Sequence, residues 1–177
     1  MKKVLIVLFA LVFPVSVWAM DIEQGKYELT GTTAFDYSST STDRDGGGNV
    51  DTDTITLNFD GQYYLQKNLA VGAFFDYTDI DIDGAGDASS WMIGPQVTYN
   101  ISIDPKLSFF VNGGIGYASY DWGSADADGW GFRFGGGVKY FIIPSVAVVG
   151  QLRYTWMDLD EVEIDEFNMG VGLSVLF

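Results

Sequence analysis

The sequence predicts an all-β protein: an eight-stranded antiparallel up-and-down transmembrane β-barrel with short periplasmic turns and longer acidic extracellular loops. Three observations predict this fold. Apolar and polar residues alternate along eight stretches after residue 26, which is the pattern of strands that face two different environments. Connections alternate between short and long, and the polar strand faces carry many glycines. Each stretch is about the 9 to 11 residues, or slightly more, that a tilted membrane strand needs.

The first four strands are expected at 27–37, 55–65, 69–77 and 91–101. In the first, Tyr27, Leu29 and Phe35 share one face, whereas Glu28 and Asp36 lie on the other. The apolar stripes of the next three are Ile55, Leu57, Phe59, Tyr63 and Leu65; then Leu69, Val71, Ala73, Phe75 and Tyr77; then Trp91, Ile93, Val97, Tyr99 and Ile101. Each stripe is expected to face lipid.

The last four strands are expected at 107–117, 130–140, 146–156 and 167–177. Their apolar stripes are Leu107, Phe109, Val111, Ile115 and Tyr117; Trp130, Phe132, Phe134, Val138 and Tyr140; Val146, Val148, Leu152, Tyr154 and Trp156; and Phe167, Met169, Val171, Leu173, Val175 and Phe177. Tyr and Trp gather near the ends of these stripes, as they do at membrane interfaces.

The connections set the topology. Short turns are expected at 66–68, 102–106 and 143–145, and longer polar loops at 38–51, 79–90, 120–129 and 157–165. Short turns at one end and long loops at the other are typical of an outer-membrane barrel. A soluble lipocalin-like barrel with an apolar interior is the alternative. Glycines on the polar faces, such as Gly72, Gly114, Gly137 and Gly172, favour a crowded interior instead.

The first residues read as a secretory signal peptide. Two lysines precede a mostly apolar run from Val4 to Val17, and cleavage is expected after Ala19. A membrane anchor is the alternative, but the run contains Pro14 and is shorter than the roughly 20 residues of a spanning helix. The barrel domain is therefore expected to occupy residues 20–177.

Composition excludes several classes of function. A net charge of -15 repels nucleic acid, and the absence of cysteine excludes a disulfide scaffold. Because the chain also has no histidine, it lacks the usual general base and the commonest metal ligand. No serine has a spacing that suggests an activated nucleophile, so the sequence predicts neither an enzyme nor a cofactor.

The signal peptide, the eight alternating stretches, the rhythm of turns and loops, and the terminal MGVGLSVLF together resemble one superfamily. It is the small outer-membrane β-barrel superfamily that includes the OmpA transmembrane domain, OmpX and Ail. The resemblance implies residence in the outer membrane of a Gram-negative cell. It also implies that the aromatic C-terminal residue, Phe177, is read by the barrel-assembly machinery.

Charged residues on the inward faces are expected to pair, because an eight-stranded barrel is about wide enough to be filled by its own side chains. Strand positions predict a lower cluster of Glu28, Asp60 and Lys139 and an upper cluster of Asp36, Asp76, Arg133, Arg153 and Glu166. We interpret this network as a structural plug, with a gate or ion path as the alternative. Aromatic side chains would fill part of the remaining space: Tyr64, Phe74, Phe110 and Phe141.

The stretch DIDIDGAGD at 79–87 resembles a calcium loop in its aspartates. Asp79, Asp81, Asp83 and Asp87 are the weak metal candidates, but Ser90 stands where an EF-hand needs glutamate. Asp79, Asp81 and Asp83 occupy odd positions, which are the lipid-facing positions of the third strand. Because charges are not stable in hydrocarbon, the membrane segment should end near Tyr77. A solvated acidic hairpin is therefore favoured over a Ca²⁺ site.

The function expected from these features is that of a structural or surface-interaction protein, with membrane lipid and lipopolysaccharide as partners and a monomeric state. Only Arg44 among the basic residues lies in a predicted outer loop, so direct binding of anions is disfavoured. The alternative is a narrow, OmpW-like channel for small or apolar solutes. The sequence does not specify a surface partner.

Overall fold

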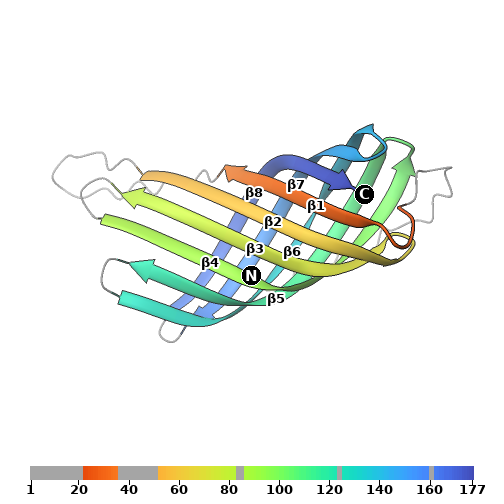
Figure 1. Ribbon diagram of the computed structural model, residues 1–177. Coiled ribbons are helices and arrows are strands. Elements are labelled where there is room, and N and C mark those ends of the chain that lie inside the picture. Colours follow the sequence, from red (N-terminus) through yellow and green to blue (C-terminus); the bar gives the residue numbers. More distant parts are fainter. Residues whose placement is uncertain (1–21, 36–51, 83–85, 123–124, 160–161) are drawn as a thin grey trace, which may run out of the picture.

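The computed structural model describes residues 22–35, 52–82, 86–122, 125–159 and 162–177. They form eight strands: β1 (Tyr27–Phe35), β2 (Thr52–Gln66), β3 (Leu69–Ile82), β4 (Gly86–Asp104), β5 (Leu107–Trp122), β6 (Ala125–Ile143), β7 (Val146–Leu159) and β8 (Val162–Leu176). Each pairs antiparallel with its sequence neighbours, and β8 pairs with β1 to close the barrel (Figure 1). The predicted fold class is confirmed. Among the described residues, no helix is long and apolar enough to cross a membrane.

The short turns lie at one end of the barrel, where β1 begins and β8 ends (Figure 1). They occupy residues 67–68, 105–106 and 144–145. Asn68 has a φ of 65°, which asparagine adopts more easily than most residues. In the second turn, Asp104 Oδ1 accepts hydrogen bonds from the backbone N–H of Lys106 at 2.7 Å and of Leu107 at 2.9 Å. Local side-chain chemistry therefore fixes the tight turns of this end.

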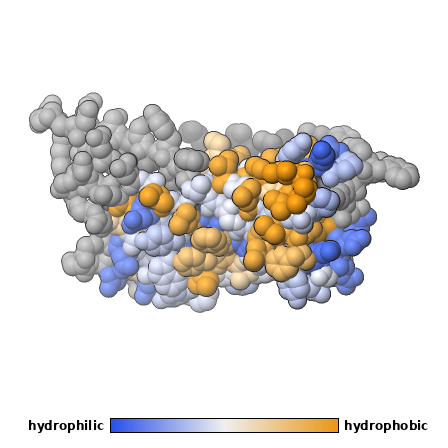
Figure 2. Space-filling model, turned by 45° about the horizontal axis from the view of Figure 1, so that its top comes forward, coloured by the Kyte–Doolittle hydropathy of each residue, from blue (hydrophilic) through white to orange (hydrophobic). Residues whose placement is uncertain are grey.

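Over most of the strand length, apolar side chains point outward and polar ones inward. On β7, buried and more exposed positions alternate along the whole strand, as a period of two requires. Leu152 is 48% exposed on the outside, whereas Arg153 beside it is 3% exposed. Figure 2 shows an apolar region across the middle of the barrel, with hydrophilic surface toward both ends. A surface of this kind fits a lipid bilayer.

Inward glycines let the strands of the barrel approach one another closely. A Cβ added at Gly137 of β6 would lie 2.1 Å from the carbonyl oxygen of Gly150 on β7. No side chain fits at that distance, so the inward glycine is required by backbone packing. The expectation that the polar face is a crowded interior agrees with this geometry.

Three of the four predicted outer loops are mostly strand. Residues assigned to loops at 79–90, 120–129 and 157–165 instead continue the ladders, with Asp79 opposite Ser89 and Asp158 opposite Glu163. The sequence reading ended the strands where outward charges began, but a strand can continue into water if its backbone groups remain paired. The fourth loop, 38–51, lies outside the described residues, as does the predicted signal peptide.

We call these continuations the distal extension: the parts of β3 to β8 that lie beyond the aromatic residues Tyr77, Trp91, Tyr117, Trp130, Trp156 and Phe167. Three of these aromatic rings adjoin one another. The centroids of Trp91 and Tyr117 are 5.9 Å apart, and those of Tyr117 and Trp130 are 6.0 Å apart. They form an interfacial girdle of the kind predicted for this height.

The polarity of the strand faces is reversed in the distal extension. Its outward side chains are acidic and exposed: Asp79, Asp121, Asp126, Asp128, Asp158, Glu163 and Asp165. Its inward side chains include Ala118, Met157 and Leu159, which are buried together with Phe74 and Met92. The extension therefore has the apolar inside and polar outside of a water-soluble barrel.

Candidate functional site

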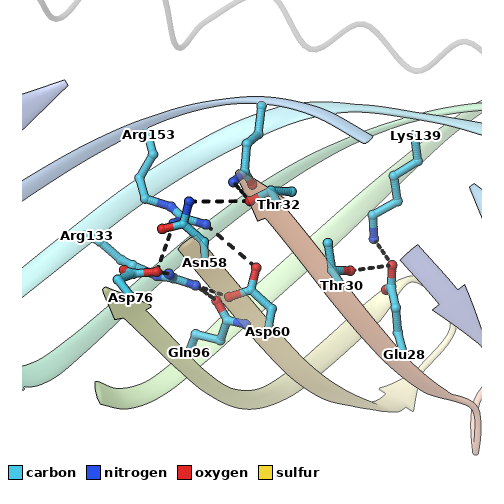
Figure 3. A network of polar contacts seen from close by, with 11 residues as sticks. Glu28, Thr30, Thr32, Asn58, Asp60, Asp76, Gln96, Arg133, Lys139 and Arg153 are labelled. Atoms are coloured by element: carbon cyan, nitrogen blue, oxygen red, sulfur yellow. Dashed lines mark hydrogen bonds and ion pairs between the residues drawn. The ribbon is translucent and has the colours of Figure 1, made fainter. Parts of the chain in front are cut away.

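The barrel interior contains a four-residue ion-pair cluster that links β2, β3, β6 and β7 (Figure 3). Arg133 Nη1 donates to both carboxylate oxygens of Asp76, at 2.7 and 2.8 Å. Arg133 Nη2 donates to Asp60 and, at 2.6 Å, to Gln96 Oε1. Arg153 Nη1 donates to Asp76 Oδ1 at 2.9 Å, and its Nη2 lies 3.7 Å from Asp60 Oδ2. We call Asp60, Asp76, Arg133 and Arg153 the upper cluster.

The upper cluster balances its own charge, with two guanidinium groups against two carboxylates. Arg133 is fully buried, and its Cζ lies 3.8 Å from the centroid of the Phe74 ring. The planar guanidinium can serve two carboxylates and a ring face at once, which an ammonium group does less well. The arrangement ties four strands together across the lumen.

A second, separate cluster lies around Glu28 of β1 (Figure 3). Lys139 Nζ lies 2.6 Å from Glu28 Oε1, and both side chains are about 2% exposed. The hydroxyl groups of Tyr64 and Ser174 also donate to the Glu28 carboxylate. Asn100 Nδ2 donates to the Tyr64 oxygen at 3.0 Å. We call Glu28 and Lys139, with these polar partners, the lower cluster.

The predicted division into two charge clusters is wrong at Asp60. The structure places Asp60 with Arg133 and Arg153, not with Glu28 and Lys139. Counting residues from the strand end ignores the stagger between tilted strands, which decides the true height of each side chain. The other ion pairs, of Lys139 with Glu28 and of the two arginines with Asp76, join residues assigned to the same predicted cluster.

Glu166 and Asp36 are the two remaining members of the predicted network. Glu166 lines a small interior cavity together with Asp76 and Arg153. Asp36 lies outside the described residues.

Sequence reasoning missed the uncharged members of the interior network. Gln96 completes the hydrogen bonds of Arg133, and Ser174 those of Glu28. Gln151 Nε2 donates to Thr32 Oγ1 at 2.6 Å, which ties β7 to β1 across the lumen. Tyr64 was expected only to fill space, yet its hydroxyl reaches Glu28. The sequence could have indicated only that these residues lie on the inward faces of their strands, because side chains alternate between the two faces.

The interior cavity beside the upper cluster is small. About 20 Å³ of it is open to the centre of a water molecule, and Thr56, Asn58, Thr78, Ser90, Trp91, Met92, Thr155, Met157 and Asn168 complete its lining. That volume holds about one or two water molecules. Its lining is mostly polar, and Trp91 and the two methionines are its apolar part.

The candidate calcium residues lie along and around the β3–β4 hairpin. Asp79 is exposed, and Asp81 stands directly opposite Asp87 in the ladder. Asp83 lies outside the described residues. Among the residues that the structure does describe, no group of three or more acidic side chains is placed to hold a metal ion. A divalent site at the hairpin tip stays a prediction.

Comparison with known proteins decides the family. A family model described as the outer membrane protein beta-barrel domain matches residues 5–174. The chain belongs to this family. No curated protein sequence matches the chain significantly.

Solved structures of outer-membrane barrels share the fold at low sequence identity. Neisserial surface protein A is 15% identical, with a TM-score of 0.65 over 87% of this chain and 98% of that one. The N-terminal β-barrel domain of Pseudomonas aeruginosa OprF is 12% identical, with a TM-score of 0.58 over 88% and 100%. Outer membrane protein W of E. coli is 19% identical, with a TM-score of 0.51 over 88% and 99%. These similarities show the fold alone.

As an outer membrane protein β-barrel, the chain resides in the outer membrane of a Gram-negative cell, embedded in the lipid bilayer. The predicted resemblance to the small eight-stranded barrels is confirmed. The short turns then face the periplasm, and the acidic distal extension projects outward from the bilayer.

Proposed function

We propose that the protein is a structural and surface-interaction component of the outer membrane whose lumen is closed by its own side chains. The observation that carries this proposal is the upper cluster, in which Arg133 and Arg153 cross the lumen to Asp60 and Asp76. Ion pairs that span the lumen of a narrow barrel leave little open cross-section through which a solute could pass. They also stiffen the scaffold that carries the outer strands.

The acidic exterior of the distal extension is the proposed contact surface. Its carboxylates cannot bind lipopolysaccharide phosphates directly, because like charges repel. Divalent cations between the two would remove that repulsion. Exposed lysines, by contrast, lie at the turn end of the barrel, at Lys26, Lys67 and Lys106. We therefore propose lipopolysaccharide, bridged by cations, as the partner at the outer surface, and a monomeric barrel.

We propose that this barrel is not an enzyme. Two inward hydroxyl groups, of Tyr64 and Ser174, donate hydrogen bonds to a carboxylate, which is the first requirement of an activated nucleophile. That carboxylate, Glu28, is also held by Lys139 and is 1% exposed. An ion-paired carboxylate without access to substrate is a poor general base. Its contacts support a structural role.

Phe177 is proposed as the signal for barrel assembly. Its backbone N–H donates to the Tyr27 carbonyl at 2.9 Å, and the Tyr27 N–H donates to the Phe177 carbonyl at 2.8 Å. The Phe177 ring stacks on Tyr27 with centroids 5.9 Å apart and remains 59% exposed. The C-terminal residue therefore closes the β1–β8 seam while its ring stays accessible from outside the barrel.

A narrow channel is the second candidate function. It is favoured by the polar cavity beside Arg153 and by buried polar atoms, such as Gln96 Nε2 and Arg153 Nε, that have no protein partner among the described residues. Groups of that kind line aqueous paths as well as structural water sites.

Single-channel conductance of the refolded protein in planar bilayers separates the two candidates. The proposed function predicts no discrete openings, with or without millimolar calcium. Stable openings that change when Arg133 or Lys139 is replaced would instead make the protein a pore. A response to calcium alone would identify the acidic hairpins as a metal site.

A further inference from the structure

The polar middle of the lumen lies between two apolar layers. The layer at the turn end consists of Ile22, Tyr64, Ala70, Phe141 and Ala147, and we call it the proximal seal. The layer at the outer end consists of Phe74, Met92, Ala118, Met157 and Leu159, and we call it the distal seal. Tyr120, Ala127 and Ile164 are partly buried and pack against the distal seal. The lower cluster adjoins the proximal seal through Tyr64, and the upper cluster adjoins the distal seal through Phe74.

Several buried polar atoms between the seals have no hydrogen-bond partner among the described residues. They are Gln62 Oε1, Gln96 Nε2, Thr98 Oγ1, Asn100 Oδ1, Asn112 Oδ1, Arg133 Nε and Arg153 Nε. Buried polar groups in folded proteins are almost always satisfied, by protein or by ordered water. The side chains carrying these atoms belong to β2, β4, β5, β6 and β7, so they surround the lumen. Internal water is the simplest partner for all of them.

The proximal seal depends on a segment that belongs to no strand. Residues 22–26 precede β1 and fold against the end of β2 and the β2–β3 turn. The Ile22 side chain is 1% exposed within the seal. Its backbone N–H donates to Asn68 Oδ1 at 2.9 Å, and its carbonyl accepts from the Asn68 N–H at 3.0 Å. Two further bonds hold the segment: Gly25 N–H donates to the Tyr64 carbonyl, and Tyr64 N–H donates to the Lys26 carbonyl, each at 2.9 Å.

The two seals differ in how they can open. All five residues of the distal seal belong to strands, so their backbones are held by the ladder hydrogen bonds of the barrel. Ile22 is held by its own burial and by the few bonds of a short segment outside the strands. Local openings in proteins occur where few contacts must be broken. The proximal seal is therefore the weaker of the two.

We propose that the lumen is an internal binding site for ordered water, closed by apolar seals, and that residues 22–26 act as a strap whose Ile22 side chain is the periplasmic stopper. In this arrangement the ion pairs fix the scaffold, while apolar contacts decide whether water and ions enter. The proposal rests on the proposed function, in which the lumen is closed, and it assigns that closure to the two apolar seals.

The absence of cysteine from the chain makes a single introduced thiol a clean probe. Thr98 is 1% exposed and lies between the two charge clusters in sequence along β4, with Gln96 on one side and Asn100 on the other. In a Thr98→Cys protein, reaction of the thiol with silver ion, which is small enough to follow water, is measured from the periplasmic side. Unreacted thiol is then counted after unfolding.

The test compares Ile22→Asp with the matched control Ile22→Val, each combined with Thr98→Cys. Since burial of the Ile22 side chain holds the stopper in place, Ile22→Asp should speed the silver reaction about tenfold or more, and Ile22→Val should leave it slow. Asn68→Gly, which removes a strap hydrogen bond while the turn keeps its positive φ, should give a smaller increase. Folding of each variant is checked by heat-dependent gel mobility.

The silver experiment can overturn the proposal in two ways. One is a silver reaction that Ile22→Asp and Asn68→Gly leave unchanged in folded protein. The other is acceleration by the paired change Arg133→Met with Asp60→Asn but not by the strap variants, which would make the ion pairs the gate.

Bound water is tested separately, by magnetisation transfer from water to the Gln96 side-chain amide, and its absence would also contradict the proposal. Conductance by the unaltered protein would refute the closed lumen itself, independently of the strap comparison.

Discussion

The membrane part of the barrel and the distal extension use the same strands with opposite polarity. On β7, the outward Leu152 faces lipid and the inward Arg153 lies in the upper cluster. Six residues after Leu152 on the same outward face, Asp158 is exposed, and its neighbours Met157 and Leu159 are buried in the lumen. One continuous strand therefore crosses from a hydrocarbon solvent into an aqueous one.

The difference shows that the solvent, not the backbone, sets the pattern of each region. A membrane strand must present apolar groups to lipid, and its polar groups then have to satisfy one another inside. A strand in water gains free energy by burying the apolar side instead. The strand period of two is common to both, so only the sign of the alternation changes.

The largest expected effect lies in the polar interior of the membrane part. Replacing Arg133 by Met removes one partner of both Asp60 and Asp76 and leaves a single guanidinium group, that of Arg153, beside two buried carboxylates. We expect a loss of about 3–5 kcal/mol in the free energy of unfolding, measured by denaturant titration in lipid vesicles. Adding Asp60→Asn, which leaves the ion pair between Arg153 and Asp76 in place, should restore part of that loss. A loss below about 1 kcal/mol would mean that the cluster behaves like surface ion pairs.

The next effect compares the outward faces of the two regions on one strand. Leu152→Arg places a charge in hydrocarbon and should cost about 2–4 kcal/mol. Asp158→Arg places the same side chain on the same face of the distal extension, opposite Glu163, and should cost nothing measurable. The same unfolding experiment measures both variants. Equal losses would refute the boundary that we draw between the two regions.

A smaller effect is expected from comparing inner and outer glycines within the membrane part. Gly137→Ala would force its Cβ to within 2.1 Å of a carbonyl oxygen, whereas at Gly150 the nearest atom to an added Cβ is 3.7 Å away. We expect Gly137→Ala to cost about 1–3 kcal/mol, as overpacked sites do. The Gly150→Ala variant is the matched control and should change stability little. A similar cost at both positions would mean that strand packing is not limited by the inner face.

The smallest effect concerns pH and the acidic exterior of the distal extension. Asp121 and Asp126 stand opposite each other on β5 and β6. Their side-chain hydrogen bond, and the negative charges of Asp126 and Asp128, raise the pKa of Asp121 above its ordinary 3.8. Between 3.8 and that raised pKa, the folded protein holds more protons than the unfolded chain, so stability falls as pH rises.

The Asp126→Asn variant tests this pair. It should return the pKa of Asp121 toward its ordinary value and flatten the pH dependence in that window. Carboxyl-carbon NMR titration measures the first effect, and unfolding at several pH values measures the second. Glu23→Gln, at the opposite end of the barrel, serves as the control that should leave both unchanged.

The sequence alone predicts some features of the molecule well, such as the face of the strand on which a residue lies, and others poorly, such as the ends of strands and the contacts in the lumen. The outward and inward assignments of Leu152, Arg153 and Lys139 followed directly from parity. The ends of β3, β5 and β7 did not, because outward charges were taken as the end of the strand rather than as its entry into water. The alternation of strand faces placed Tyr64 inside, but its bond to Glu28, and that of Ser174, which the sequence did not single out, depend on neighbouring strands.

By itself, the sequence determined which side of the barrel wall each residue of the membrane strands occupies, since a strand with two solvents has a period of two and one apolar face. Only the tertiary structure decided which inward residues meet. Asp60 and Arg133 are 73 residues apart in the chain, and the stagger of the strands brings them to the same height. Likewise, the burial of Ile22 follows from how residues 22–26 fold over the closed barrel, which no local pattern specifies.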